Sequence, residues 1–457
     1  MRRTLKEQTV LVPQSPKQQH SRELEEISNV LDERAEILES VRSDLVGTSS
    51  EGTGREGLSA DQVLRAAIIR QTHGLSYREL EFHLSDSRSF RRFVRLGFEE
   101  YPSFRRLQSN IKKITAETWE QLNRALLGQA KEDGIEPGQK LRTDCTVVDS
   151  DIHHPTDSGL LWDCVRVVTR LMSALAVLEP RIYYLFTDHT RRAKRRSFEI
   201  AQPRGKNKKK SRRKAYLDLI KVSSRTLGYA RRILEHIEGS RDLPRDNLLE
   251  LFGKEIELDH YVELMVQVLD QTRRRVIDGE KVPSSEKIVS IFEPHTDIIV
   301  KDRREVQYGH KICLTGGTSS LIIDCVIEEG NPADSTLAER SVQRASEILG
   351  HMPKQVSFDG GFASKKNVAG VKKLGVEDVA FHKKRGIEIE DMVKNSRVFK
   401  QLRNFRAGIE GCISTLKRAY GLGRCIWRGL ESFRAYVWNS VVSYNLMTLA
   451  RHRLTEG

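Results

Sequence analysis

Three acidic residues occupy positions from which they could act together on a substrate. Asp144 lies inside a predicted strand, residues 140–149, whose other residues suit a buried sheet. Asp359 follows a second predicted strand, and open α/β sheets bind ligands at the carboxyl ends of their strands. Glu410 lies in a predicted helix. Each type of position alone is usually structural, so the prediction depends on the three meeting in the fold.

Two basic residues accompany Glu410 on its helix. Arg406, Glu410 and Lys417 are offset by 0, 4 and 11 residues, which at about 100° per residue places them in a stripe about 40° wide. Converging carboxylates favour Mg²⁺, because this hard cation prefers oxygen ligands. Two such ions about 4 Å apart support an in-line displacement at phosphorus. We therefore expect Asp144, Asp359 and Glu410 to hold two Mg²⁺ ions, which Mn²⁺ can replace; the competing acids are Asp149, Asp151, Asp157 and Asp324.

The positive charge of the chain is concentrated in one segment. Lys and Arg number 77 against 63 Asp and Glu, a net charge of +14. Residues 191–214 contain 13 basic residues and one acid, Glu199, so this segment alone carries +12. The run favours nucleic acid as a partner over an anionic membrane surface, with a solvated loop as the alternative. The residues expected to contact DNA phosphate here are Arg195, Arg196, Lys208, Lys209, Lys210, Arg212, Arg213 and Lys214.

Length and composition exclude several classes of protein. The chain has 457 residues, enough for about three domains, and 38% of them are hydrophobic. No apolar run approaches the roughly 18 residues of a membrane-spanning helix, and residues 1–20 lack the apolar segment of a secretory signal. The six cysteines are widely separated, without a Cys-x-x-Cys pair. We therefore expect reduced thiols in a cytoplasmic protein.

Residues 21–46 are predicted to form one helix. Its apolar residues, from Leu24 to Leu45, recur at spacings of three and four. This stripe packs on its own domain or, at about three heptads, forms a dimeric coiled coil. The small, polar residues 47–57 are predicted to be a flexible linker.

Residues 58–132 are predicted to be a cluster of short helices. Ser59 opens the first helix, and Ser76 with Glu79 forms a capping box that opens the second. Helices joined by tight turns with arginines nearby are typical of a helix-turn-helix DNA reader, although a plain helical bundle has the same features. Arg105 and Arg106 are the residues expected to contact DNA here.

An α/β pattern begins at about residue 138 and is interrupted by a helical segment, residues 158–283. Since an insertion must leave and re-enter a sheet at neighbouring points, Asp144 is expected beside strands that follow the insertion. Those strands are predicted near 288–300, 308–315 and 320–328, the last apolar enough for a buried central strand. The later elements are predicted as a helix at 336–349, a strand at 355–358, a helix at 365–373, a strand at 376–382, and helices at 397–420 and 429–452.

The segments DCTVVDSDIHHPTDSGLL, FDGGFAS and RNFRAGIEGCISTLKRAYGLGR resemble the three catalytic blocks of bacterial insertion-sequence transposases of the DDE type. The first block includes a Pro-Thr-Asp-Ser segment, here Pro155–Ser158. The third carries an Arg-x3-Glu-x6-Lys signature, here Arg406, Glu410 and Lys417, which implies that Arg406 and Lys417 contact DNA phosphate beside the carboxylates. Some relatives have a tyrosine three residues before that arginine, where this chain has Arg403. The segment LSADQVLRAAIIRQTHGLSYRELEFHL resembles the helical DNA-binding domain of the same family.

The resemblance implies a fold class and a function. The implied fold is an α/β RNase-H-like catalytic core with a large helical insertion, plus an all-α N-terminal DNA-binding domain. The implied function is Mg²⁺-dependent cleavage of DNA at the ends of a mobile element and strand transfer into target DNA. The implied partners are double-stranded DNA, as terminal inverted repeats and as target, and further copies of the chain in a homodimer or larger synaptic complex. The alternatives are a catalytically inactive DNA-binding descendant and an RNase-H-like nuclease.

The sequence pattern and the resemblance together give the expected domains. They are the N-terminal helix and linker (1–57), the DNA-binding domain (58–135), the catalytic domain (136–157 and 284–427), the basic insertion (158–283) and a C-terminal helix (428–457). Trp427, which follows the Glu410 helix, is expected to pack in the core or to stack on a displaced base.

Overall fold

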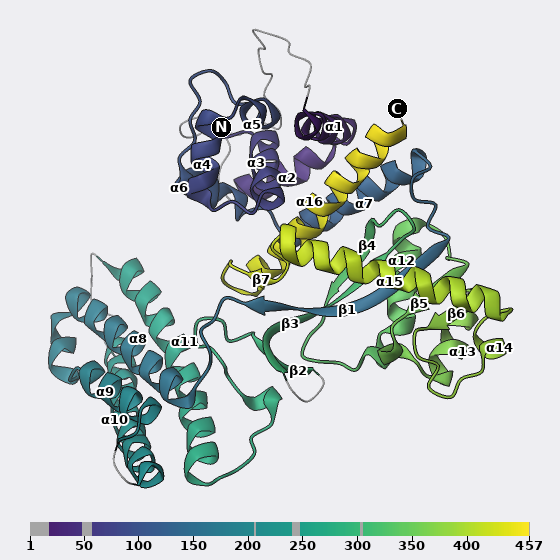
Figure 1. The fold of residues 1–457 in the computed structure, drawn as a ribbon. Coiled ribbons are helices and arrows are strands. Elements are labelled where there is room, and N and C mark those ends of the chain that lie inside the picture. Colours follow the sequence, from purple (N-terminus) through teal and green to yellow (C-terminus); the bar gives the residue numbers. More distant parts are fainter. Residues whose placement is uncertain (1–17, 48–56, 205–206, 240–246, 302–304, 457) are drawn as a thin grey trace. The chain divides into compact units, whose positions relative to one another are not determined.

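The structure of the chain is a computed structural model that describes residues 18–47, 57–204, 207–239, 247–301 and 305–456 (Figure 1). It contains two compact units: unit 1 comprises residues up to Asp151 and from Gly309 onward, and unit 2 comprises Ile152–Tyr308. Most of the N-terminal segment 1–20 and of the predicted linker 47–57 lies outside the described residues. Across the described ranges, none of the helices combines the length and apolar character needed to cross a membrane. All six cysteines are free thiols, as predicted.

Unit 1 begins with a group of short helices. The single helix predicted at 21–46 is instead two, α1 (Gln19–Glu33) and α2 (Ile37–Val46), because the backbone leaves the helical conformation at Arg34. Both helices bury their apolar residues within this chain, which supports packing of the stripe on its own domain. The following helices are α3 (Ala60–Thr72), α4 (Tyr77–Asp86), α5 (Arg88–Val94), α6 (Phe104–Ile111) and α7 (Ala116–Glu132).

Helix α3 is the most enclosed helix of this group. It begins with a capping box in which the Ser59 side chain accepts from the Gln62 backbone N–H and the Gln62 side chain accepts from that of Ser59. The predicted capping box of Ser76 and Glu79 begins α4 in the same way. Residues 60–71 are all buried, since α3 packs against α2, α5, α6 and the C-terminal helix α16 (Leu430–Glu456). Helix α4, by contrast, leaves most of its side chains exposed or half-buried.

A mixed sheet forms the core of unit 1. In space its strands follow the order β4-β3-β1-β5-β6, with β7 also paired to β1. β1 pairs antiparallel with β3 and parallel with β5, so segments on both sides of the insertion meet, as predicted; Asp144, for example, lies opposite Leu314. The strands are β1 (Lys140–Ser150), β3 (Glu305–Gly316), β4 (Ile322–Ile327), β5 (Gln355–Phe358), β6 (Asp378–Phe381) and β7 (Arg424–Cys425).

Two strand predictions were wrong in part. The segment 320–328 forms β4, but among the described residues β4 pairs only with β3 and so lies at an edge of the sheet rather than at its centre. It is buried because α7, α12 (Ala338–Leu349) and α16 pack against it. In the segment 288–300, only β2 (Asp297–Lys301) is a strand. At the start of the segment 288–300, the backbone N–H of Ile288 donates to the Gln271 side chain and the Ile288 carbonyl accepts from it. These hydrogen bonds replace strand pairing there.

The remaining helices of unit 1 are α13 (Lys365–Lys373), α14 (Ile389–Met392) and α15 (Ser396–Ala419), followed by α16. Three of them, α13, α15 and α16, begin and end close to the predicted positions, whereas the short helix α14 was not predicted. Helix α16 packs against α1, α3 and α7, and Gln71 of α3 donates to the Tyr420 carbonyl at 2.7 Å and to the Ser440 hydroxyl at 2.9 Å. One apolar core therefore connects the N-terminal helices, the sheet and α16.

Unit 2 is a bundle of helices with its own apolar core. It extends beyond the predicted insertion, 158–283, at both ends. Helix α8 packs against each of the other three long helices, and the described part of the basic run lies on α9, in the segment that follows α9 and on the first turns of α10. The four long helices are α8 (Asp157–Leu178), α9 (Thr190–Ala201), α10 (Lys208–Glu238) and α11 (Leu248–Thr272).

Candidate active site

The strand register places two of the three acids side by side. β1 and β5 are parallel neighbours in which Thr143 pairs with Phe358, and Asp144 and Asp359 are the next residues along each chain. β5 ends at Phe358, so Asp359 begins the turn that continues through Gly360–Phe362. Asp359 therefore lies at the carboxyl end of a strand, next to Asp144.

Contacts from the sheet hold α15 in place. Arg142 of β1 donates from Nη1 to the Phe405 carbonyl at 3.1 Å, and its guanidinium carbon lies 4.8 Å from the centroid of the Phe405 ring. Ser357 of β5 donates to the Leu402 carbonyl at 2.9 Å. Gly408 leaves room for the arginine, since a Cβ atom there would lie 1.6 Å from Arg142 Nη1. These contacts fix the helix that carries the third acid.

Arg142 and Ser357 are positioning residues that the sequence pattern did not single out. The alternation of side chains along the strand could have indicated Arg142, because it precedes Asp144 by two residues and so lies on the same face of the sheet. A buried arginine in a strand is uncommon and needs hydrogen-bond partners, but the sequence does not show which carbonyls those are.

Arg406 joins all three acids. Its Nη2 lies 2.8 Å from Asp144 Oδ2 and 3.0 Å from Asp359 Oδ1. Its Nη1 lies 2.5 Å from Oε1 of Glu410, one turn further along α15. The Arg406 side chain is 7% exposed, whereas those of Asp144, Asp359 and Glu410 are 15%, 36% and 58% exposed. Three carboxylates therefore converge on one buried guanidinium, with Glu410 on the solvent side.

The charges of this cluster do not balance, because three carboxylates face one arginine. Burial raises the pKa of Asp144 to about 6. Arg406 and a hydrogen bond from the Cys145 backbone N–H lower this pKa, while Asp359 and Glu410 raise it further. The ion pair with Arg406 alone would lower the pKa, but the loss of hydration outweighs it. The site thus carries excess negative charge that a further cation would neutralise.

The chemistry of these residues fits a divalent cation. Carboxylate oxygens are the ligands that Mg²⁺ and Mn²⁺ prefer, and three of them surround one positive group. Within the ranges that the structure describes, no group of three or more His, Cys, Asp or Glu is arranged to hold a metal ion. The acids have the required charge and donor atoms, but the Arg406 guanidinium lies between them.

Two of the competing acids of unit 1 are paired with arginines of their own. Asp324 accepts two hydrogen bonds from Arg344, at 2.8 and 3.0 Å. Asp151 lies 3.1 Å from Arg424. Each of these acids therefore has a local structural partner outside the cluster around Arg406.

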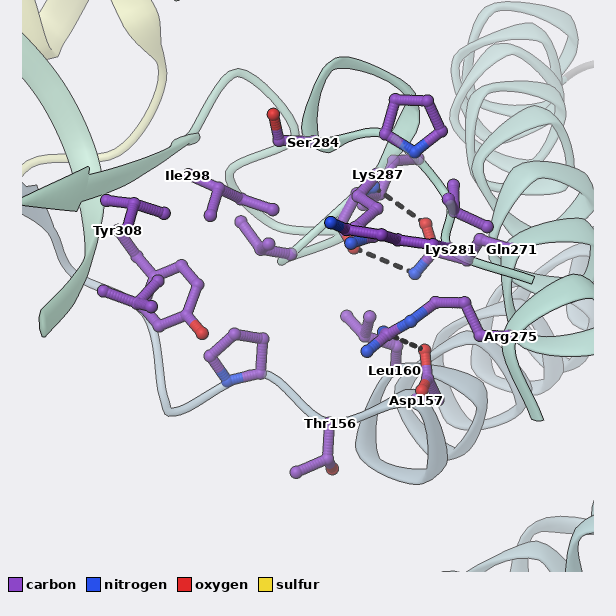
Figure 2. A pocket seen from close by; sticks show the side chains of 17 residues that line it. Thr156, Asp157, Leu160, Gln271, Arg275, Lys281, Ser284, Lys287, Ile298 and Tyr308 are labelled. Carbon is purple, nitrogen blue, oxygen red and sulfur yellow. Dashed lines mark hydrogen bonds and ion pairs between the residues drawn. The ribbon is translucent and has the colours of Figure 1, made fainter. Parts of the chain in front are cut away.

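Asp157 lines a cavity of about 580 Å³ in unit 2 (Figure 2). Its Oδ1 lies 2.9 Å from Nη1 of Arg275, which lines the same cavity. Burial raises the pKa of Asp157, and Arg275 lowers it. Thr156 caps α8 by accepting from the Gly159 backbone N–H at 3.0 Å. The Pro155–Ser158 segment thus forms the start of a helix and part of a cavity wall.

The basic run contains both paired and solvent-facing side chains. Arg192 and Arg196 both bind Asp218 of α10, at 2.5 and 2.6 Å, and Arg196 also lies 2.6 Å from Glu199. These two arginines already hold α9 against α10. Among the described residues of the run, the exposed basic ones are Arg191, Lys194, Arg195, Arg204, Lys208, Lys209, Lys210, Arg212, Arg213 and Lys214.

The other predicted contact residues lie on unit 1. Lys417 is half-buried on α15, two turns beyond Glu410. Arg105 is exposed on α6 and Arg106 is half-buried. Trp427 is 2% exposed, and its ring centroid lies 5.5 Å from that of Tyr436, which agrees with core packing and leaves no face for a displaced base.

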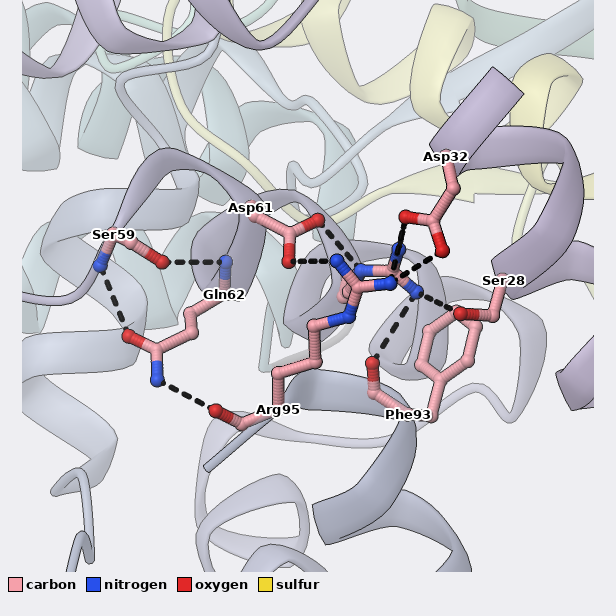
Figure 3. A network of polar contacts seen from close by, with 8 residues as sticks. Ser28, Asp32, Ser59, Asp61, Gln62, Phe93 and Arg95 are labelled. Atoms are coloured by element: carbon pink, nitrogen blue, oxygen red, sulfur yellow. Dashed lines mark hydrogen bonds and ion pairs between the residues drawn. The ribbon is translucent and has the colours of Figure 1, made fainter. Parts of the chain in front are cut away.

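A second cluster of arginines and aspartates lies among the N-terminal helices (Figure 3). Arg65 is fully buried, with Nε 2.6 Å from Asp61 and Nη2 2.8 Å from Asp32. Arg95 contacts the same two acids, Asp32 at 2.5 Å and Asp61 at 3.2 Å. Arg65 also donates to the Phe93 carbonyl. Two arginines thus face two aspartates, and the cluster ties α1, α3 and α5 together.

Two models of known protein families match parts of this chain. A family model described as a transposase DDE domain matches residues 267–446, which include Asp359, Arg406, Glu410 and Lys417. A second model, described as a transposase domain (DUF772), matches residues 12–113, which span α1 to α6. Neither the curated proteins nor the solved structures gave a match. The chain therefore belongs to the DDE transposases of insertion-sequence type, enzymes that cleave DNA and transfer its strands by metal-dependent phosphoryl transfer.

Proposed function

We propose that Asp144, Asp359 and Glu410 are the catalytic carboxylates of this transposase and hold two Mg²⁺ ions, which Mn²⁺ can replace. The observation that carries the proposal is that all three contact the same guanidinium, at 2.5–3.0 Å. When bound, the cations supply the charge that activates the attacking oxygen and stabilises the leaving oxygen of an in-line displacement.

The basic residues of α15 complete the site in this proposal. Phosphoryl transfer requires positioning and positive charge around the phosphate. Arg406 lies against the carboxylates and Lys417 two turns beyond Glu410 on the same helix, so both are suited to contact the phosphates next to the cleaved bond. Arg142 and Ser357 hold this helix on the sheet and so orient Glu410.

We also assign a role in catalysis or DNA binding to each of the other regions of the chain. The sheet with α15 (136–157 and 284–427) is an RNase-H-like catalytic core, and 158–283 is an insertion whose exposed basic residues grip the DNA backbone. The helices of 58–135 read the terminal inverted repeats, with Arg105 and Arg106 on α6. The enzyme acts on element ends and target DNA in the bacterial cytoplasm, as a homodimer or larger synaptic complex.

The test is DNA cleavage by full-length variants on a duplex that carries one element end. Asp144→Asn, Asp359→Asn and Glu410→Gln each remove one charge and keep the shape of the side chain. We expect each to lower Mg²⁺-dependent cleavage by about 1,000-fold or more, with DNA affinity within about twofold of wild type. Asp391→Asn, which changes an exposed acid of α14, is the matched control and should cleave normally.

Three further outcomes bear on the assignment. Ca²⁺ should support DNA binding without cleavage, because its looser coordination does not maintain the in-line geometry. Normal cleavage by any one of the three variants would remove that residue from the metal site, and Asp157 or Asp324 would then be tested. Joining of a cleaved 3′ end to a target plasmid distinguishes a transposase from an RNase-H-like nuclease, which would cut without joining.

A further inference from the structure

Arg406 occupies the position between the three carboxylates that a bound cation would need. One of its nitrogens, Nη2, is within 3.0 Å of both Asp144 and Asp359, and the other, Nη1, contacts Glu410. A cation held jointly by Asp144 and Asp359 would coincide with Nη2. The acids meet the chemical requirements of a metal site, yet no metal-holding group of three is formed in the described residues.

The guanidinium is held mainly by these ion pairs, while the helix that carries it is fixed. The buried Nε atom of Arg406 has no hydrogen-bond partner among the described atoms. The backbone of α15, by contrast, is attached to β1 through Arg142 and to β5 through Ser357. Displacement of the guanidinium therefore requires rotation of one side chain and no movement of the helix.

We propose that Arg406 acts as an exchangeable internal cation: it neutralises the carboxylates in the metal-free enzyme, and a divalent ion displaces it when it binds. This rests on the proposed metal-holding role of the three acids. Removing the arginine from the carboxylates costs ion pairs, so it weakens the binding of the metal to the free protein. The displaced guanidinium then needs a new anion, and a DNA phosphate beside the metal is the anion that the reaction provides.

The direct consequence is competition between Arg406 and the metal, which is measurable without DNA. Full-length protein is titrated with Mn²⁺, and the free ion is followed by its electron paramagnetic resonance signal. We expect Arg406→Gln to bind Mn²⁺ about tenfold more tightly than wild type, since the carboxylates no longer have an internal partner. Arg403→Gln is the matched control, because it removes one charge from an exposed position of the same helix and should change the affinity by less than about twofold.

The melting temperature shows whether Arg406→Gln still folds, and a second variant, Arg406→Lys, keeps the positive charge. Without an internal cation, Arg406→Gln should melt at a lower temperature than wild type in chelator and should gain more from added Mn²⁺. Arg406→Lys keeps the charge but offers a single nitrogen, so it contacts fewer carboxylates and Mn²⁺ affinity should rise severalfold. Wild-type Mn²⁺ affinity in both Arg406 variants would overturn the proposal, as would weaker binding in either.

The same titration separates this inference from the proposed function. If Asp359→Asn loses Mn²⁺ binding while Arg406→Gln binds as wild type does, only the exchange of Arg406 is refuted. If wild type, Asp359→Asn and Arg406→Gln all bind Mn²⁺ alike, the three carboxylates are not the metal site and both proposals fail. The double variant Asp359→Asn/Arg406→Gln should lose the tightened binding, which would locate the gain at these carboxylates.

Discussion

Two clusters in unit 1 use the same side chains for different purposes. Around Arg65, two arginines face two aspartates, and each aspartate contacts both arginines. Around Arg406, a single arginine faces three carboxylates, and one of them, Glu410, is largely exposed. The first cluster is balanced in charge and connects three helices. The second has an excess of negative charge at the end of a strand.

The difference shows how a buried ionic cluster can be classified as scaffold or as site. A balanced cluster needs nothing further, and removing one member leaves an unpaired charge in the interior. An unbalanced cluster is unfavourable by itself, as the raised pKa of Asp144 indicates, and becomes favourable when a cation arrives. Matched substitutions in the two clusters should therefore change stability in opposite directions.

The largest effect on stability is expected for Asp61→Asn in the balanced cluster. Asp61 is 2% exposed and contacts Arg65 and Arg95, so its loss leaves excess positive charge inside the protein. We expect the free energy of unfolding to fall by about 3–5 kcal/mol. Urea denaturation followed by circular dichroism measures this change. A loss below about 1 kcal/mol would show that water or a rearranged partner compensates the arginines, and the contrast between the clusters would not hold.

The matched change in the unbalanced cluster, Asp144→Asn, should stabilise the metal-free protein. The native pKa of Asp144 is raised from 3.8 to about 6, so between these values the native state binds more protons than the unfolded state. Stability therefore falls as pH rises through this range and stays low above it. The asparagine variant avoids this loss.

We expect the advantage of Asp144→Asn to be near zero at pH 4 and to reach at most about 3 kcal/mol above pH 7. Thermal denaturation in chelator at pH 5 and pH 8 tests this, and saturating Mn²⁺ should reverse the order by stabilising only the wild type. A destabilised Asp144→Asn at pH 8 in chelator would mean that the ion pair with Arg406 outweighs burial.

The smallest effect on stability is expected in the basic run, where arginines that form ion pairs lie close to exposed basic residues. Replacement of the exposed residues Lys208, Lys209, Lys210, Arg212, Arg213 and Lys214 by serine should leave the melting temperature unchanged. It should lower affinity for all duplex DNA alike and flatten the dependence of log K on log salt, by about 0.9 for each phosphate that the variant no longer neutralises. Fluorescence anisotropy at several salt concentrations measures the slope.

The paired arginines of the run provide the control. Arg192→Ser with Arg196→Ser breaks the ion pairs to Asp218 and should cost about 1 kcal/mol or less, because these half-buried ion pairs remain partly accessible to water. The salt slope should change little in that variant. A slope unchanged by the six serines would mean that the exposed run is a solvated surface and that DNA is held elsewhere.

The sequence alone predicted most of the local structure and a set of acids that could meet. Capping boxes at Ser59 and Ser76, apolar periods and turn residues predicted most helices and strands, because these signals act within a few residues. The helical stripe of Arg406, Glu410 and Lys417 was also readable, since α15 is a regular helix. The prediction failed where one local pattern fits two structures. The continuous apolar run of β4 fits either a central strand or an edge strand covered by helices, and β4 is an edge strand under three helices.

Only the tertiary structure decided which of the acids meet and which cation they share. The register of β1 with β5 places Asp144 beside Asp359, and the hydrogen bonds of Arg142 and Ser357 place Glu410 against them. The pairing of Asp157 and Asp324 with arginines of their own is equally a matter of long-range packing. Electrostatic interaction depends on distance and burial, which are properties of the fold, so a charge written in the sequence becomes scaffold or site only after the chain has folded.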